Sequence, residues 1–180
     1  MKHFAVYPGS FDPITNGHLD LLERALTSFD KVVILVAANN GKVNMFSPVE
    51  RVELIKAVIS GRSYRDRVVV DCFDGLLVDY VKKIRAHAVV RGLRATGDFE
   101  YEFMMALMNR KLNPDVETFF LMTGARWVYT SSRLIKEAAM AGGCINGLVP
   151  ETVEKVLLER LGRNPRGTEA DKSFTLNAGL

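Results

Sequence analysis

The stretch FAVYPGSFDPITNGH, residues 4–18, decides the fold because it joins a short apolar run to the start of a helix. The apolar run, Phe4 to Tyr7, predicts a buried strand. Prolines and glycines then form a turn, and from Leu19 onward apolar residues recur three and four positions apart, which predicts a helix. A strand that passes through a tight turn directly into a helix is typical of the first β-α unit of an α/β protein.

The same alternation of strands and helices continues along the chain. The segment Ser47-Pro48-Val49-Glu50 combines an N-cap, a proline at the first helical position and a capping-box glutamate, so a helix is expected to begin there, with Val49 and Ile55 on its buried side. We therefore predict an α/β fold with a Rossmann-like, doubly wound, five-stranded parallel sheet and helices on both faces. Further strands are predicted at residues 32–38, 68–73, 88–91 and 118–122, and further helices at 77–85, at 98–112, from about 131 and from about 150.

Composition and charge restrict the class of protein. The 180 residues are 48% hydrophobic and 25% charged, which fits one globular domain, predicted at residues 1–162, with a flexible tail at 163–180. The net charge of +3, spread along the chain, gives no indication of a nucleic-acid or membrane partner. No apolar stretch is long enough for a signal-peptide core or a membrane span, so a cytoplasmic location is expected. Cys72 and Cys144 lack metal-ligand spacing and are expected to be small buried hydrophobic residues.

The first loop has the composition of a phosphate site. Gly9 permits a tight turn, Ser10 offers a hydroxyl, and Gly17-His18 lie where the N–H groups at a helix N-terminus favour an anion. The alternative is that the glycines and prolines only form the turn and that His18 only caps the helix. In a doubly wound sheet the ligand binds beyond the carboxyl ends of the strands, which favours the phosphate site.

The complete string resembles a known superfamily. Thr15-Asn16-Gly17-His18, after a strand and the turn Gly-Ser-Phe-Asp-Pro, resembles the nucleotidyltransferases, whose usual His-x-Gly-His has threonine in its first position in one branch. From Phe4 to about Leu161 the chain looks like the phosphopantetheine adenylyltransferase family of bacterial coenzyme A synthesis. The resemblance rests on residues 7–18, on Lys42 before Met45-Phe46, on 91–95 with 98–102, and on 127–136.

That resemblance implies a reaction and its partners. The expected activity is reversible transfer of an adenylyl group from ATP to 4'-phosphopantetheine, which gives dephospho-coenzyme A and pyrophosphate by direct in-line attack. Because the acceptor phosphate is already anionic, positioning and charge neutralisation should carry the catalysis. The resemblance also implies Mg²⁺ bridging the phosphates, a homohexamer and feedback inhibition by coenzyme A.

The family's functional positions map onto this chain residue by residue. The catalytic residues implied are His18, Lys42, Ser10 and Arg91, and the acceptor site adds Leu77 to Ser10, Lys42 and Arg91. No side chain is expected to bind a metal directly. The ATP-binding residues implied are Ser10, Phe11, His18, Gly92, Leu93, Arg94, Glu102, Trp127, Val128, Tyr129, Thr130, Ser131, Ser132 and Arg133.

Several of these residues also have a simpler explanation. Lys42 fits a solvated loop lysine, Leu77 fits the core, and Ser131-Ser132 fits an ordinary helix cap. The chain departs from the commoner family pattern at Ser10, where threonine is usual, and at Arg133, where a serine hydroxyl is usual. Three other functions stay open: a sister nucleotidyltransferase using nicotinate mononucleotide or a cytidylyl donor, a class I aminoacyl-tRNA synthetase, which 180 residues scarcely accommodate, and a non-catalytic nucleotide sensor.

Overall fold

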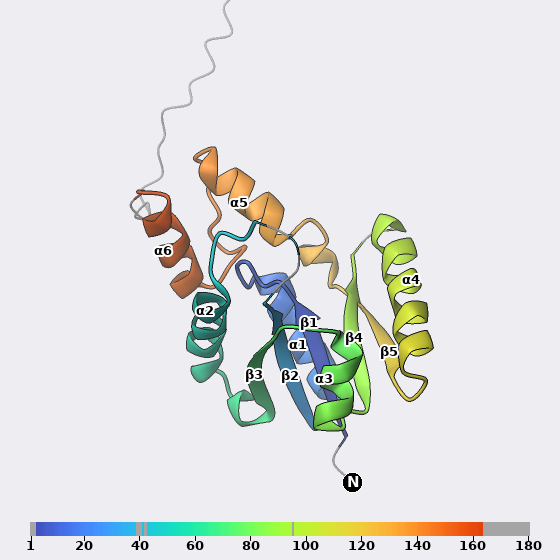
Figure 1. Cartoon of the computed structure of the whole chain (residues 1–180). Coiled ribbons are helices and arrows are strands. Elements are labelled where there is room, and N and C mark those ends of the chain that lie inside the picture. Colours follow the sequence, from blue (N-terminus) through green and yellow to red (C-terminus); the bar gives the residue numbers. More distant parts are fainter. Residues whose placement is uncertain (1–2, 39–40, 42, 95, 164–180) are drawn as a thin grey trace, which may run out of the picture.

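A computed structural model describes residues 3–38, 41, 43–94 and 96–163, without the side chains of 96–98. The described chain forms a five-stranded parallel sheet in the order β3-β2-β1-β4-β5, with helices on both faces (Figure 1). The predicted α/β, doubly wound fold is therefore confirmed. The strands are β1 (Phe4–Gly9), β2 (Lys31–Ala37), β3 (Val68–Phe73), β4 (Ala88–Leu93) and β5 (Glu117–Met122).

Each predicted helix is present, with ends shifted by a few residues. Two short 3₁₀ helices, η1 (Arg65–Arg67) and η2 (Ala125–Trp127), were not expected from the apolar pattern because three residues carry no periodicity. The α-helices are α1 (Asn16–Ser28), α2 (Pro48–Ser60), α3 (Leu77–Ile84), α4 (Thr96–Leu112), α5 (Ser132–Met140) and α6 (Glu151–Arg160).

The strand order places the loops after β1 and β4 side by side. The chain moves outward from β1 to β2 and β3, then returns to lay β4 against the other side of β1. Val6 is therefore in register with Val33 on one side and with Val89 on the other. Because parallel strands end at the same edge of the sheet, the β1–β4 boundary is a switch point where a ligand can enter between diverging loops.

The core has one layer on each face of the sheet. Side chains alternate between the faces of a strand, so Ala5 and Tyr7 pack with α1, α2, α5 and α6, whereas Val6 packs with α3. Val78 and Val81 of α3 complete the second, smaller layer. The sheet is thus covered by helices on both faces.

Helix α2 confirms the predicted start but not the whole predicted stripe. Ser47 Oγ accepts a hydrogen bond from the Glu50 N–H at 3.3 Å, and the Glu50 carboxylate accepts one from the Ser47 N–H at 2.7 Å. Ile55 is buried as predicted, but the prediction for Val49 is wrong, because its side chain is 71% exposed. The buried side of the helix instead includes Arg51, which no apolar pattern could indicate.

Other expectations are corrected or stay open. Cys144 is exposed and Cys72 is half-buried, so the prediction that both are buried is wrong. Arg163, the first residue of the predicted tail, donates hydrogen bonds to the carbonyls of Ala139 and Met140, and residues 164–180 lie outside the described part. The domain boundary therefore remains a prediction. In the described part of the chain, no helix is both long and apolar enough to cross a membrane.

The capping box of α2 gives a stability prediction. Replacing Ser47 by alanine removes the acceptor for the Glu50 N–H, so Ser47→Ala should lower the free energy of unfolding by about 1 kcal/mol. Urea unfolding followed by circular dichroism measures this change. Ser60→Ala is the control, because the Ser60 hydroxyl only donates to the Ala57 carbonyl in the last turn of the same helix. Equal effects of the two substitutions would contradict the capping assignment.

Candidate active site

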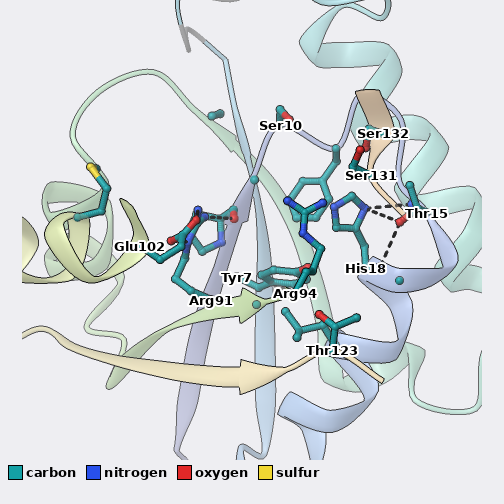
Figure 2. Close-up of a pocket in the computed structure, with 18 of the residues that line it drawn as sticks. Tyr7, Ser10, Thr15, His18, Arg91, Arg94, Glu102, Thr123, Ser131 and Ser132 are labelled. Carbon is teal, nitrogen blue, oxygen red and sulfur yellow. Dashed lines mark hydrogen bonds and ion pairs between the residues drawn. The ribbon is translucent and has the colours of Figure 1, made fainter. Parts of the chain in front are cut away.

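A cavity of about 630 Å³ opens at the carboxyl ends of β1 and β4 (Figure 2). It lies between the loop after β1, the start of α1, helix α4 and the start of α5. Most of the predicted site residues contribute to its wall, although they come from segments far apart in the sequence. Those in the wall are Ser10, Phe11, His18, Leu77, Arg91, Gly92, Arg94, Glu102, Thr130, Ser131, Ser132 and Arg133.

The remaining predicted residues lie elsewhere. Lys42 is outside the described residues, so its predicted contact with the phosphates stays a prediction. Leu93 ends β4, where its carbonyl accepts a hydrogen bond from the Thr123 N–H at 3.1 Å. Residues 127–129 form the end of η2 and the turn before α5, and they are not part of the cavity wall. Their place next to the wall fits a role in shaping the loop.

The loop after β1 is held by a buried carboxylate. Asp12, only 2% exposed, accepts hydrogen bonds from the N–H groups of Met45 at 3.0 Å and Phe46 at 2.9 Å. The same carboxylate is ion-paired with Lys136 of α5. Its charge is therefore compensated inside the protein, and one side chain connects the first loop to two distant segments.

Phe11 closes the inner side of the same loop. Its φ of 46° is in the left-handed region, which costs a non-glycine residue on the order of 1 kcal/mol. The ring is 1% exposed and packs edge-on against Tyr7 and His18, with ring centroids 5.3 and 5.1 Å apart. A Cβ at Gly9 would come within 2.9 Å of this ring, so glycine is needed there for the close approach.

His18 takes part in a capping box at the start of α1. The Thr15 hydroxyl oxygen accepts from the His18 N–H at 3.2 Å, and His18 Nδ1 accepts from the Thr15 N–H at 3.0 Å. The alternative that His18 has a capping role is thus correct in part: Thr15 is the N-cap and His18 is its N3 partner, which uses only one edge of the ring. Because Nδ1 is an acceptor, we assign the proton to Nε2, which Figure 2 shows on the edge turned toward the centre of the cavity.

The protonation of His18 follows from its surroundings. Burial in the pocket, and then the positive charges of Arg94 and Arg91, lower its pKa from the usual 6.5 to about 4. The imidazole is therefore neutral at pH 7. A neutral imidazole held through Nδ1 offers one fixed N–H donor at Nε2, and its one lone pair, on Nδ1, already accepts from the Thr15 N–H.

Arg91 ends β4 and is fixed by a bidentate ion pair. Its Nε and Nη2 donate to the two carboxylate oxygens of Glu102 at 2.6 and 2.5 Å, and its Nη1 donates to the Pro8 carbonyl at 2.8 Å. A guanidinium has five N–H donors, so two are left over after these contacts. Figure 2 shows this pair on the opposite side of the cavity from His18, with Arg94 and Tyr7 between them. Glu102 thus orients Arg91.

The start of α5 forms the wall next to His18. Ser131 is the N-cap, since its hydroxyl oxygen accepts from the Leu134 N–H at 3.1 Å, and the Ser132 hydroxyl donates to the Pro13 carbonyl at 2.7 Å. A Cβ at Gly17 would lie 2.6 Å from the Thr130 hydroxyl, so only glycine lets these two segments meet. The N-termini of α1 and α5 consequently converge on one cavity, and both favour an anion.

Arg133 lies at the rim of the cavity. Its side chain is 86% exposed and its Nε donates to Glu137 at 2.9 Å, one helical turn away. The pair is a solvated i,i+4 contact worth little by itself. Arg133 therefore adds positive charge at the opening rather than a buried contact that replaces a serine hydroxyl.

Several wall residues were not predicted from the sequence. Tyr101, Met105 and Asn109 on α4 follow one another at intervals of four, and Ala106 follows Glu102 by four. That spacing places them along one side of the helix, a signal that was available once Glu102 had been identified. With Leu77 they make the far end of the cavity mostly apolar, whereas the His18 end is polar.

Metal ligands are sparse in this cavity. Within the described ranges, no group of three or more His, Cys, Asp or Glu side chains is placed to hold a metal ion. Glu102 is the acidic residue in the cavity wall, and both of its oxygens already bind Arg91. The described side chains therefore do not fit a metal held by the protein alone.

Comparison with known proteins places the chain among nucleotidyltransferases. Residues 6–138 match the family model described as cytidylyltransferase-like. The chain is 54% identical over 160 residues to the phosphopantetheine adenylyltransferase of Syntrophus aciditrophicus, a match covering 89% of this chain and 95% of that protein. It is 56% identical over 160 residues to the phosphopantetheine adenylyltransferase of Moorella thermoacetica, with 88% and 97% covered.

Solved structures support the fold independently. A protein from Vibrio parahaemolyticus assigned as a nicotinate-nucleotide adenylyltransferase superimposes with a TM-score of 0.65 at 21% identity, over 92% of this chain and 98% of that one. A bifunctional NMN adenylyltransferase/ADP ribose pyrophosphatase from Francisella tularensis gives 0.64 at 17% identity, over 86% and 47%. At these identities the likeness concerns the fold alone.

The state of His18 can be measured directly. In nitrogen-15 NMR of histidine-labelled protein, His18 should show the neutral Nε2–H tautomer and should not titrate between pH 8 and about 5, because its pKa is about 4. Since the folded pKa lies below the unfolded value of 6.5, this group costs stability as the pH falls from about 6.5 to about 4. A midpoint near 6.5, or an Nδ1–H tautomer, would contradict the assignment.

Proposed function

This chain belongs to the phosphopantetheine adenylyltransferase family, and from that premise we propose that it transfers an adenylyl group from ATP to 4'-phosphopantetheine. The products are dephospho-coenzyme A and pyrophosphate, and the reaction is reversible. The observation that carries the proposal is the arrangement of the cavity: a neutral His18 donor between two helix N-termini faces the cation Arg91, next to an apolar extension.

The acceptor fits the side of the cavity that α3 and α4 line. Leu77, Met105 and Ala106 provide an apolar wall suited to the pantetheine arm. At the end of that wall, Arg91 has two N–H donors left after its bonds to Glu102 and Pro8, enough for a forked contact with a phosphate. Ser10, in the loop after β1, also lines the cavity. We assign Lys42 to this phosphate on the family resemblance.

ATP fits the side formed by α1 and α5. Helix α5 begins at the cavity end that Ser131 and Ser132 line, and the Ser131 hydroxyl already accepts from the Leu134 N–H. The positive end of the helix dipole and the other N–H groups of the first turn suit the β- and γ-phosphates. Arg94, which donates to the Thr130 carbonyl at 3.4 Å, and Arg133 at the rim add positive charge. Gly92 also lines the cavity, and we assign it to ATP on the family resemblance.

Adenylyl transfer requires mainly that the two substrates are held in line in the cavity. An oxygen of the acceptor phosphate attacks the α-phosphorus of ATP, the new P–O bond forms, and the bond to the β-phosphate oxygen breaks with its electron pair on pyrophosphate. The acceptor is already anionic, so no side chain has to remove a proton. His18 Nε2–H donates to an oxygen of the α-phosphoryl group as charge develops there, while Arg91 and Ser10 hold the nucleophile in line.

Mg²⁺ belongs to this proposal as a companion of ATP. Because the described side chains offer no carboxylate cluster, we propose that the ion is held mainly by the triphosphate and water. Bound there, it supplies neutralisation of phosphate charge. Coenzyme A as feedback inhibitor is a further part of the proposal and rests on the resemblance. A cytoplasmic location, expected from the short apolar stretches, and a tail at 163–180, expected from composition, are parts of the proposal as well.

We also propose that the chain assembles with copies of itself, as a homohexamer by family resemblance. Helix α4 leaves a row of apolar side chains uncovered in the single chain: Phe99, Phe103, Met104, Leu107, Met108 and Leu112. Six exposed apolar side chains on one helix are typical of an interface between proteins. The helix also carries Glu102 into the cavity, so an assembly through α4 would brace the catalytic wall.

The assembly can be tested on α4 itself. The double substitution Met104→Glu, Met108→Glu places two charges on the uncovered face and should dissociate the oligomer to smaller species, measured by multi-angle light scattering. Val49→Glu is the control, because Val49 is an even more exposed apolar residue but lies on α2. An unchanged mass for the α4 variant, or a monomeric wild-type protein, would refute the proposed assembly.

The reaction can be tested by pyrophosphate release with 4'-phosphopantetheine as acceptor, against nicotinate mononucleotide as the competing acceptor. Replacing His18 by alanine removes one fixed donor to the developing charge, so kcat should fall by about 10²–10³. The affinity for ATP should change by less than about fivefold, since the donor acts mainly in the transition state. His87→Ala, an exposed histidine before β4, is the control. Near-normal kcat in His18→Ala would refute the role of His18.

A further inference from the structure

Arg51 of α2 is fully buried and has no acidic partner in the described part of the chain. Its exposed fraction is 0%, and by volume it ranks first among the fully buried side chains described. Arginine is almost never fully buried unless it is paired, because burying an isolated charge is costly. The ion pairs of the described residues include none to Arg51.

The contacts of Arg51 are to neutral backbone oxygens. Its Nη1 donates to the Ser10 carbonyl at 2.7 Å and to the Ala37 carbonyl at 3.1 Å. Its Nε and Nη2 have no hydrogen-bond partner among the residues that the structure describes. Asp12, the buried carboxylate of the same loop, is already paired with Lys136. Two neutral carbonyls therefore accept hydrogen bonds from Arg51, but no negative charge of the described residues is paired with it.

Both of those carbonyls belong to residues in the wall of the cavity. Ser10 follows β1 and Ala37 ends β2, and each lines the cavity although Arg51 itself does not. Arg51 thus lies directly behind the wall, where it joins the first loop to the end of the strand that leads to Lys42. A charge in that place acts on an anion in the cavity through a layer of protein, where screening by water is weak.

We propose that Arg51 is a positioning residue for the terminal phosphate of the acceptor. It fixes the Ser10 loop against the end of β2 and places an unbalanced positive charge behind the surface that the phosphate contacts. The cost of burying this charge is offset when the anionic substrate is bound. This inference rests on the proposed function, since it assumes that the phosphate of the acceptor lies next to Ser10.

A purely structural role is the competing explanation, and Arg67 provides the comparison. Arg67 also joins segments by donating to carbonyls, with Nε on Asp30 at 2.9 Å and Nη2 on Leu26 and Phe29 at 2.5 and 2.7 Å. It precedes β3 and therefore lies at the opposite, amino-terminal edge of the sheet. Arg67→Met removes similar contacts without changing the charge near the cavity.

The experiment compares two ligands that differ by one phosphate. Dissociation constants for 4'-phosphopantetheine and for pantetheine are measured by calorimetry without ATP, on the wild-type protein and on Arg51→Met, Arg51→Gln and Arg67→Met. The ratio of the two constants reports the preference for the phosphate. In Arg51→Met this preference should fall by roughly tenfold, the order expected when one charge is removed about 10 Å from an anion at an effective dielectric of about 20.

The outcomes separate the inference from the proposed function. The inference is supported if the preference falls in both Arg51 variants and holds in Arg67→Met. It is overturned if folded Arg51→Met keeps a preference within twofold of wild type, or if Arg67→Met loses as much. Should Arg51→Met fail to fold by circular dichroism, the preference measured for Arg51→Gln, which keeps N–H donors but carries no charge, decides the role of Arg51. A wild-type protein that releases no pyrophosphate refutes the proposed function, while the ligand ratio still decides the role of Arg51.

Discussion

The buried carboxylate of Asp12 is the interaction on which the rest of the site depends. It accepts two N–H groups from residues 45 and 46 and is paired with Lys136, so one side chain joins the first loop, the segment before α2 and helix α5. An unpaired carboxylate in that position would be strongly destabilising, so the three segments are held in place together. Ser10, His18 and Ser132 are brought to one cavity because the loop and α5 cannot separate.

The charged arginines and the neutral His18 around the cavity suit phosphate transfer. Arg91 is held in a fixed orientation by its two hydrogen bonds to Glu102. Burial of the ring, and then the positive charges of Arg94 and Arg91, lower the pKa of His18 and keep it neutral, so it donates from Nε2 while Nδ1 accepts from Thr15. The cavity thus combines fixed cations with one directional donor. An attack by an anionic phosphate requires orientation and charge neutralisation more than a base.

Helix α4 connects this chemistry to the outer surface of the molecule. Glu102, Tyr101 and Met105 line the cavity, while Met104 and Met108 belong to the uncovered apolar row. Because adjacent helix positions are about 100° apart, one helix can serve both surfaces at once. Its apolar residues surround the helix on most sides, which is why amphipathicity in the sequence did not separate the cavity side from the exterior.

The sequence by itself determined the succession of strands and helices along the chain, the capping box at Ser47 and the turn at residues 9–18 that predicts a phosphate site, because these depend on local periodicity and turn chemistry. Family resemblance added Arg91, Glu102 and Ser131, which the structure brings to one cavity. Only the tertiary structure decided that Glu102 orients Arg91, that Asp12 pairs with Lys136 and that Arg51 is buried while Val49 is exposed. Each of these depends on contacts between segments far apart in the chain. The apolar periodicity of one helix does not show which other element will pack against that helix.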